Sequence, residues 1–211
     1  KQKTAYEMLR SLVGSEMCIR DRIIQILFDS GIDVDAKNHN GETSLHLAIK
    51  SGKIKAMQKL IELGADINQQ DNNKNTVLHF AAQSDNVEIM QMFITPKTKI
   101  DIKNANNETP LHLAAKSGNI QILMLLIDLG ANTNAIDYHG NTLLHHAAQS
   151  DNKEMLQLVI NMGFNVNVAN YNGITPLYLA VNLGNMEAMN MLIGNGADIN
   201  ICPIPNKHIH C

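Results

Sequence analysis

The stretch Asn104–Gly118, "NANNETPLHLAAKSG", decides the fold because it joins a turn-forming run to the start of a helix. A threonine hydroxyl such as that of Thr109 can accept a backbone N–H left free at a helix N-terminus. Pro110 follows at the first helical position, which needs no donor. The stretch therefore predicts a helix that begins after Thr109, with Leu111 in the core and Ala114 where neighbouring helices approach closely.

Related stretches recur every 33 residues. The other four begin at Asn38, Asp71, Asp137 and Asn170 and read "NHNGETSLHLAIKSG", "DNNKNTVLHFAAQSD", "DYHGNTLLHHAAQSD" and "NYNGITPLYLAVNLG". Each copy continues with a helical apolar run. The period and the T-P-L-H-x-A motif at residues 109–114 resemble the ankyrin repeat family. The resemblance implies an all-α fold, an ankyrin-repeat solenoid of helix–turn–helix units with β-hairpin-like connecting loops.

The repeat register divides the chain into segments. The expected segments are a non-repeat stretch at 1–22 (an artefact or disordered), a partial ankyrin repeat at 23–37, full repeats at 38–70, 71–103, 104–136, 137–169 and 170–202, and a tail at 203–211. The second full repeat departs from the others, because "TPKTKI" puts Pro96 and Lys97 where "LGADI" usually stands. We expect its second helix to end early, near Ile94. Glycine fills the turn between the two helices in three repeats, whereas Asp85 and Asp151 fill it in the other two, and we expect all five to tolerate the left-handed conformation.

Residues 12–21, "LVGSEMCIRD", have no matching copy and break the register. They place Glu16 in a slot that close packing reserves for alanine. One interpretation is an atypical terminal repeat. The other is that the stretch resembles a translated sequencing-library adapter, which predicts adapter codons in the source DNA. Because the last repeat shows no polar cap and the expected helix at residues 23–28 has no credible partner helix before it, we expect the chain to be a fragment of a longer protein.

Composition argues against several classes of protein. The 211 residues carry a net charge of −3 and no basic block, which argues against nucleic-acid binding. No apolar run is long enough for membrane insertion. Three cysteines, Cys18, Cys202 and Cys211, are too few for a disulfide framework, so we expect a reducing, cytoplasmic location. The sequence leaves the oligomeric state open.

Histidines also recur at the repeat period, at positions 46, 79, 112 and 145. The resemblance implies that they bond backbone groups, and residues one repeat apart, about 10 Å, cannot converge on one metal ion. His146 stands where other copies have Leu or Phe. It is either a core-edge histidine with a local hydrogen bond or a functional one. The tail residues Cys202, His208, His210 and Cys211 are interpreted as a flexible end rather than a metal site. No catalytic motif occurs, so we expect no enzyme, cofactor or metal.

The ankyrin resemblance implies a protein partner, bound by the loop tips and the inner helix surface. The variable slots would carry specificity, including the slot of Glu42, Asn75, Glu108, Asn141 and Ile174. The predicted partner-binding residues are Tyr138, His139, Tyr171, Ile174, Leu183, His39, Lys50 and Lys116. Aromatic residues are over-represented in binding hot spots, so we expect the two tyrosines to anchor the partner, although exposed tyrosines can also be merely tolerated. The expected function is a non-catalytic protein–protein interaction scaffold. The alternative is a regulatory ankyrin segment of a larger enzyme or channel.

Overall fold

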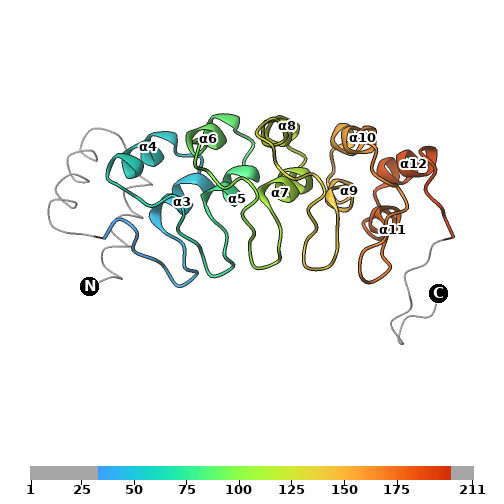
Figure 1. Ribbon diagram of the computed structural model, residues 1–211, viewed down its shortest axis with the longest axis horizontal. Coiled ribbons are helices and arrows are strands. Elements are labelled where there is room, and N and C mark those ends of the chain that lie inside the picture. Colours follow the sequence, from blue (N-terminus) through green and yellow to red (C-terminus); the bar gives the residue numbers. More distant parts are fainter. Residues whose placement is uncertain (1–32, 201–211) are drawn as a thin grey trace. The chain divides into compact units, whose positions relative to one another are not determined.

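The computed structural model describes residues 33–200, and these residues form ten α-helices and no β-strand (Figure 1). The chain divides into two compact units, residues 1–98 and 99–211, which we describe separately. Unit 1 holds α3 (Ser44–Lys50), α4 (Ile54–Glu62), α5 (Val77–Ala82) and α6 (Val87–Met92). Unit 2 holds α7 (Pro110–Ser117), α8 (Ile120–Asp128), α9 (Leu143–Ala148), α10 (Lys153–Asn161), α11 (Pro176–Asn182) and α12 (Met186–Gly194).

Each unit is built in two layers of helices. In unit 2, α7, α9 and α11 lie next to the connecting loops and form the inner layer, while α8, α10 and α12 form the outer layer (Figure 1). Unit 1 repeats this order, with α3 and α5 inside and α4 and α6 outside. The inner helices begin at residues 44, 77, 110, 143 and 176, so their spacing is 33 residues throughout and the predicted all-α repeat fold is confirmed.

A threonine stands at the N-cap of every inner helix, as predicted. In the first four, the histidine three positions later turns its Nδ1 atom back to accept the threonine backbone N–H. For Thr109 and His112 this distance is 3.0 Å. In the fifth inner helix, Thr175 Oγ1 instead accepts the N–H of Tyr178 at 3.2 Å. The helix starts are therefore fixed by contacts local in sequence, which is why the motif predicts them so well.

The inner helices bury the positions that the motif assigns to the core. The five repeated leucines are at most 7% exposed and the five repeated alanines are fully buried. Burying one leucine side chain contributes about 2 kcal/mol to the free energy of folding. A larger side chain in the alanine slot would overpack the contact between neighbouring helices at a cost of roughly 1–3 kcal/mol.

Helix α6 is short, and this confirms the prediction from "TPKTKI". It ends at Met92. Helix α4 ends at Glu62, a position that lies three residues later within its own repeat. Beyond α6, the backbone N–H of Thr95 donates to Thr98 Oγ1 at 2.7 Å, and the same hydroxyl donates to the carbonyl of Phe93 at 3.0 Å. Threonine side chains thus satisfy backbone groups that a longer helix would have paired.

The prediction for two helix–helix turns was wrong. Gly118 adopts the left-handed conformation with φ of 75°, but neither Asp85 nor Asp151 is among the described non-glycine residues with positive φ. In the Asp85 turn, Ser84 Oγ donates to the carbonyl of Ala81 at 2.7 Å and reaches the carbonyl of Asn86 at 3.3 Å. The single hydroxyl proton serves the nearer Ala81 carbonyl, one of the carbonyl groups left without a helical partner at the end of α5.

None of the helices within residues 33–200 has the length and apolar character to cross a membrane. The adapter-like stretch 12–21, most of the partial repeat 23–37, and the tail with its Cys and His residues lie outside the described residues.

Candidate functional site

Buried side chains at the base of each loop hold the loop tips in place. In the fourth repeat, Asp137 Oδ1 accepts the backbone N–H groups of His139 and Asn141, both at 2.8 Å. In the fifth repeat, Asn170 Oδ1 accepts the N–H groups of Asn172 and Ile174 at 2.9 and 3.0 Å. The tips of unit 2 are therefore preorganised by their own first residue.

One carboxylate and one amide share the base of each of the first four loops, and the two exchange places between repeats. In the third repeat, Asn104 Nδ2 donates to Glu108 at 2.9 Å, whereas in the fourth Asn141 Nδ2 donates to Asp137 at 2.8 Å. Unit 1 shows the same exchange between its two loops, at 2.8 and 3.0 Å. Glu108 and Asn141 are buried, which corrects the interpretation of this slot as a variable contact surface.

Tyr138 and Tyr171 occupy equivalent places on neighbouring tips, and their side chains are 69% and 71% exposed. Their backbones are nonetheless fixed. The Tyr138 N–H donates to the carbonyl of Asn106 at 2.8 Å, and the Tyr171 N–H donates to the carbonyl of His139 at 2.9 Å. The Tyr138 ring also meets the His139 ring edge-to-face at 5.8 Å. The loops thus present two aromatic rings on a rigid backbone.

Gly140 makes room for the second of these rings. A Cβ atom at this position would lie 2.8 Å from Cδ1 of Tyr171, and Gly140 has φ of +79°. Glycine is needed both for its backbone conformation and for the close approach of the ring. Tyr171 therefore lies against the preceding loop on one side while most of its surface stays in contact with solvent.

Apolar side chains continue this surface toward the end of α11. Leu183 is 57% exposed, as predicted for a contact residue, while Ile174 is half-buried. Val181, which the sequence interpretation missed, is 50% exposed. Its slot holds alanine in three other repeats, and this departure from alanine is the signal that could have identified it.

Two of the predicted contact residues are already engaged within their own units. Lys50 forms an ion pair with the buried Glu42, and its Nζ atom lies 4.6 Å from the centre of the Phe80 ring. Burial alone would raise the pKa of Glu42, but the hydrogen bonds from Lys50 and Asn38 outweigh it and lower that pKa. Lys116 Nζ lies 4.0 Å from Glu108 in unit 2. Both lysines face the base of their own loop, so a partner would meet them already paired.

His39 lies on a tip of unit 1 and is exposed. Its carbonyl accepts the side-chain amide of Asn72 at 2.9 Å. The predicted residues therefore fall on two surfaces. His39 and Lys50 belong to unit 1. The other six belong to unit 2.

The recurring histidines use their ring nitrogens structurally. His112 accepts the Thr109 N–H at Nδ1, so in this tautomer Nε2 carries the proton and donates to the carbonyl of Ala135 at 3.0 Å. His145 does the same with the carbonyl of Ile174 at 3.0 Å. Burial lowers the pKa of His112 to about 4 and also lowers that of His145. The predicted backbone-bonding role is thus confirmed for all four histidines, because each accepts the backbone N–H of its threonine. No group of three or more His, Cys, Asp or Glu that could hold a metal ion occurs within residues 33–200.

His146 is buried beside Asp137, with its Nε2 atom 3.3 Å from Oδ2. This is an ion-pair distance, but neither ring nitrogen of His146 makes a well-formed hydrogen bond among the described residues. Its ring contacts the His112 ring at 4.9 Å. Burial opposes ionisation of Asp137, yet the close His146 and the hydrogen bonds from Asn141 hold its pKa well below the ordinary range. The predicted local hydrogen bond is therefore replaced by a close electrostatic contact.

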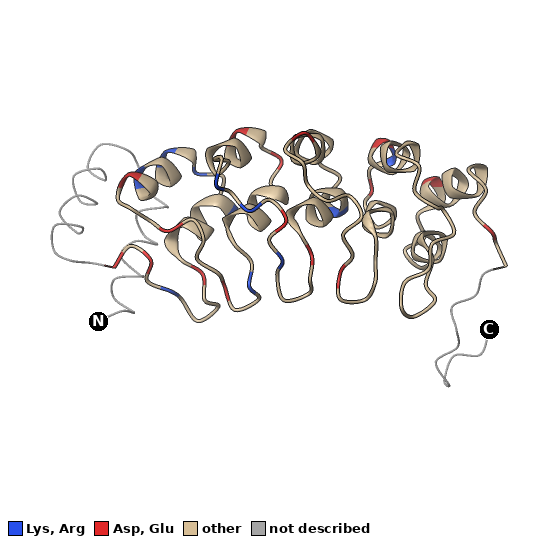
Figure 2. Cartoon of the chain, in the orientation of Figure 1, with Lys and Arg blue, Asp and Glu red and all other residues tan. Residues whose placement is uncertain are grey.

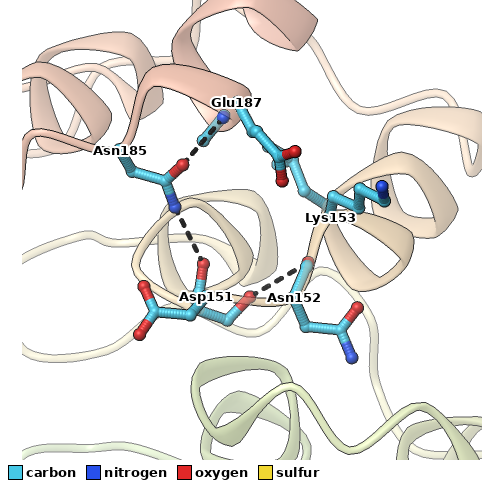
Figure 3. A pocket seen from close by; sticks show the side chains of 8 residues that line it. Asp151, Asn152, Lys153, Asn185 and Glu187 are labelled. Atoms are coloured by element: carbon cyan, nitrogen blue, oxygen red, sulfur yellow. Dashed lines mark hydrogen bonds between the residues drawn. The ribbon is translucent and has the colours of Figure 1, made fainter.

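A small pocket lies in unit 2 between the loop that joins α9 to α10 and the loop that joins α11 to α12. Its volume of about 10 Å³ is enough for one water molecule. Asn185 spans it, donating to the Ser150 carbonyl at 3.4 Å and accepting the Ala188 N–H at 2.9 Å (Figure 3). Asp151, Lys153 and Glu187 line its rim. A pocket of this size has no room for a small-molecule substrate.

Comparisons with known proteins agree with this architecture. The family model described as ankyrin repeats (3 copies) matches residues 16–104, 78–170 and 137–202. A similar solved structure is the crystal structure of the ankyrin repeat domain of Bcl-3, described as a unique member of the IkappaB protein family. It superimposes with a TM-score of 0.68 at 25% sequence identity, over 92% of this chain and 88% of that chain. The search of curated proteins found no match.

Proposed function

We propose, from the premise that this chain belongs to the ankyrin repeat family, that it is a non-catalytic scaffold whose unit 2 binds a protein partner. Ankyrin repeats are generally protein–protein interaction modules. The observation that carries the proposal is the pair of exposed tyrosines, Tyr138 and Tyr171, on loop backbones that hydrogen bonds hold rigid. Rigid aromatic side chains offer large contact areas at a low cost in conformational entropy, which is why they dominate binding hot spots.

We define the unit 2 surface as Tyr138, His139, Tyr171, Asn172, Gln149, Asn182 and Leu183. It combines the tips with the ends of α9 and α11. The ion pair between Lys50 and Glu42 shows that the end of an inner helix faces the base of its own loop. Repetition gives the same relation between the ends of α9 and α11 and their loops. We treat these residues as one proposed surface, which runs within unit 2 from the tips to the helix ends.

The alternative function is regulation, with this array serving as a segment of a larger enzyme or channel. Val181, Leu183, Met186 and Ile193 are between 44% and 62% exposed on the α11–α12 pair. Exposed apolar groups of this kind favour a further covering segment in a longer protein. Under this alternative, the unit 2 surface would hold the regulated part.

The test is the double variant Tyr138→Ala/Tyr171→Ala in the full chain. Proteins captured on the wild-type chain from a cell extract supply the partner, whose affinity is then measured with purified proteins. Loss of two hot-spot side chains should cost about 2 kcal/mol or more, which weakens binding at least 30-fold. Met124→Ala/Leu129→Ala is the matched control, because it truncates exposed side chains at α8 in the outer layer. Equal affinity of both double variants for the partner would refute the proposal.

A further inference from the structure

The unit 2 surface carries almost no uncompensated charge. Residues 155–186 contain no Asp, Glu, Lys, Arg or His. The loop before α11 and α11 itself accordingly show no charged segment in Figure 2. Two nearby carboxylates have a basic side chain beside them. Lys116 pairs with Glu108, and Asp137 is 5% exposed and faces His146. The exposed Asp151 precedes α10, and Lys153, the first residue of α10, lines the same pocket (Figure 3).

Free amide groups replace charges at the ends of the inner helices. Gln149 ends α9 as its C-cap and Asn182 is the last residue of α11, so they are equivalent positions one repeat apart. Within residues 33–200, no hydrogen bond occupies either side-chain amide. An amide offers both donors and acceptors, and these match the N–H and C=O groups of an extended main chain. Such a surface favours a peptide backbone over a charged group.

The spacing of the repeats selects the conformation of that peptide. Neighbouring helices pack about 8–10 Å apart, so equivalent groups recur at roughly that interval along unit 2. A polyproline II helix has three residues per turn and advances about 9 Å per turn. Every third residue of such a peptide would therefore meet the next repeat. A β-strand repeats its side-chain orientation every two residues, or about 7 Å, and would drift out of register.

We propose that the unit 2 surface binds an uncharged peptide segment in the polyproline II conformation. Apolar residues at every third position, preferably proline, pack on Tyr138 and Tyr171, while Gln149 and Asn182 bind main-chain groups between them. Aromatic-lined grooves suit this kind of ligand because the peptide is already extended and loses little entropy on binding. This inference rests on the proposed function and specifies its partner. The recognition depends little on salt, because no charge pair crosses the interface.

The test is selection of a phage-displayed random 12-residue peptide library on the full chain, with counter-selection on Tyr138→Ala/Tyr171→Ala. Enriched sequences should be depleted in charged residues and should place apolar residues, chiefly proline, at every third position. A synthetic enriched peptide should change its Kd less than twofold between 50 and 500 mM NaCl. The double variant should weaken its binding at least tenfold, and Met124→Ala/Leu129→Ala should leave the binding unchanged.

The outcomes separate this inference from the proposed function. Enriched peptides that depend on the tyrosines but carry clustered charges, or that repeat with a period of two, would overturn the inference and leave the proposed function standing. No enrichment over the double variant would overturn the inference and leave the proposed function standing. Binding of the captured partner to the double variant as tightly as to the wild type would contradict both.

Discussion

His146 is the residue at which the fourth repeat departs most from its neighbours. Both its ring nitrogens are buried without a well-formed hydrogen bond among the described residues, a situation that costs about 1–3 kcal/mol. The equivalent Phe80 packs its ring against His46 at 5.2 Å, much as His146 packs against His112. Asp71 is the repeat equivalent of Asp137. It accepts its hydrogen bonds from Asn73 and Asn75 although its repeat has Phe80 in place of the histidine.

The variant His146→Phe should therefore raise the free energy of unfolding by about 1 kcal/mol. Urea unfolding at pH 7 measures the change. The reverse variant Phe80→His is the matched control and should lower stability by a similar amount. A loss of stability in His146→Phe would show that the contact with Asp137 outweighs the cost of the unsatisfied nitrogens.

Buried histidines also make stability depend on pH. The pKa of His112 is about 4 in the folded state, against an ordinary value of 6.5, because burial disfavours the charged ring. The unfolded state therefore takes up a proton first as the pH falls. The free energy of unfolding should be constant above about pH 7 and should fall by about 2 kcal/mol between pH 8 and pH 5 from this group alone. The lowered pKa values of His46 and His145 act in the same direction.

Urea unfolding midpoints measured from pH 8 to pH 5 check this dependence. The carboxyl groups of Glu42 and Asp137 have lowered pKa values, so their contribution is lost only at lower pH, below their unfolded pKa of about 4. A flat midpoint between pH 7 and pH 5 would contradict the assignment of neutral, buried histidines.

At the scale of single elements, helix α4 lacks a feature that the other outer helices share. Asparagine caps α6, α8, α10 and α12 and accepts a backbone N–H from the first turn at 2.9–3.0 Å. Helix α4 has Lys53 at its N-cap instead, and this side chain accepts no backbone N–H and brings a positive charge to the helix N-terminus.

Lys53→Asn should stabilise the protein by about 1 kcal/mol, because it supplies the missing acceptor. Thermal and urea unfolding measure the gain. Lys53→Ala removes the charge without adding a cap, so it should give only the smaller, electrostatic part of the gain in stability. If the two variants prove equally stable, the capping account of the outer helices fails for α4.

Most helix boundaries were predictable because they depend on contacts local in sequence. The Thr-His pair fixes the start of the first four inner helices, and Pro96 marks the early end of α6. The turns at Asp85 and Asp151 were mispredicted: neither residue has a positive φ, and in each turn a serine hydroxyl donates to a carbonyl of the preceding helix. The start of each of these helices depends on contacts between residues no more than four positions apart. The two turns, in contrast, depend on how a side chain reaches across a loop.

At the scale of the whole molecule, the repeat period predicted the fold class, but it did not predict the division into two units. The exposure of Tyr138 and Tyr171 agrees with their place at the tips. The pairing of Lys50 and Lys116 with buried glutamates was missed, although the sequence held the signal. Wherever a repeat has glutamate in its fifth position, it has lysine in its thirteenth and asparagine in its first. Comparing the first, fifth and thirteenth positions of the repeats together, rather than one position at a time, would have revealed the paired charges.

The central claim is that repeated positions build the stack while the tips and inner helix ends of unit 2 bind the partner. Hydrogen–deuterium exchange of the full chain, with and without the captured partner, tests it most directly. The account predicts added protection at the loop tips 138–141 and 171–174 and at the helix ends 149–150 and 182–183, with α8, α10 and α12 unchanged. Protection on those outer helices, with both tips exchanging as in the free chain, would contradict it.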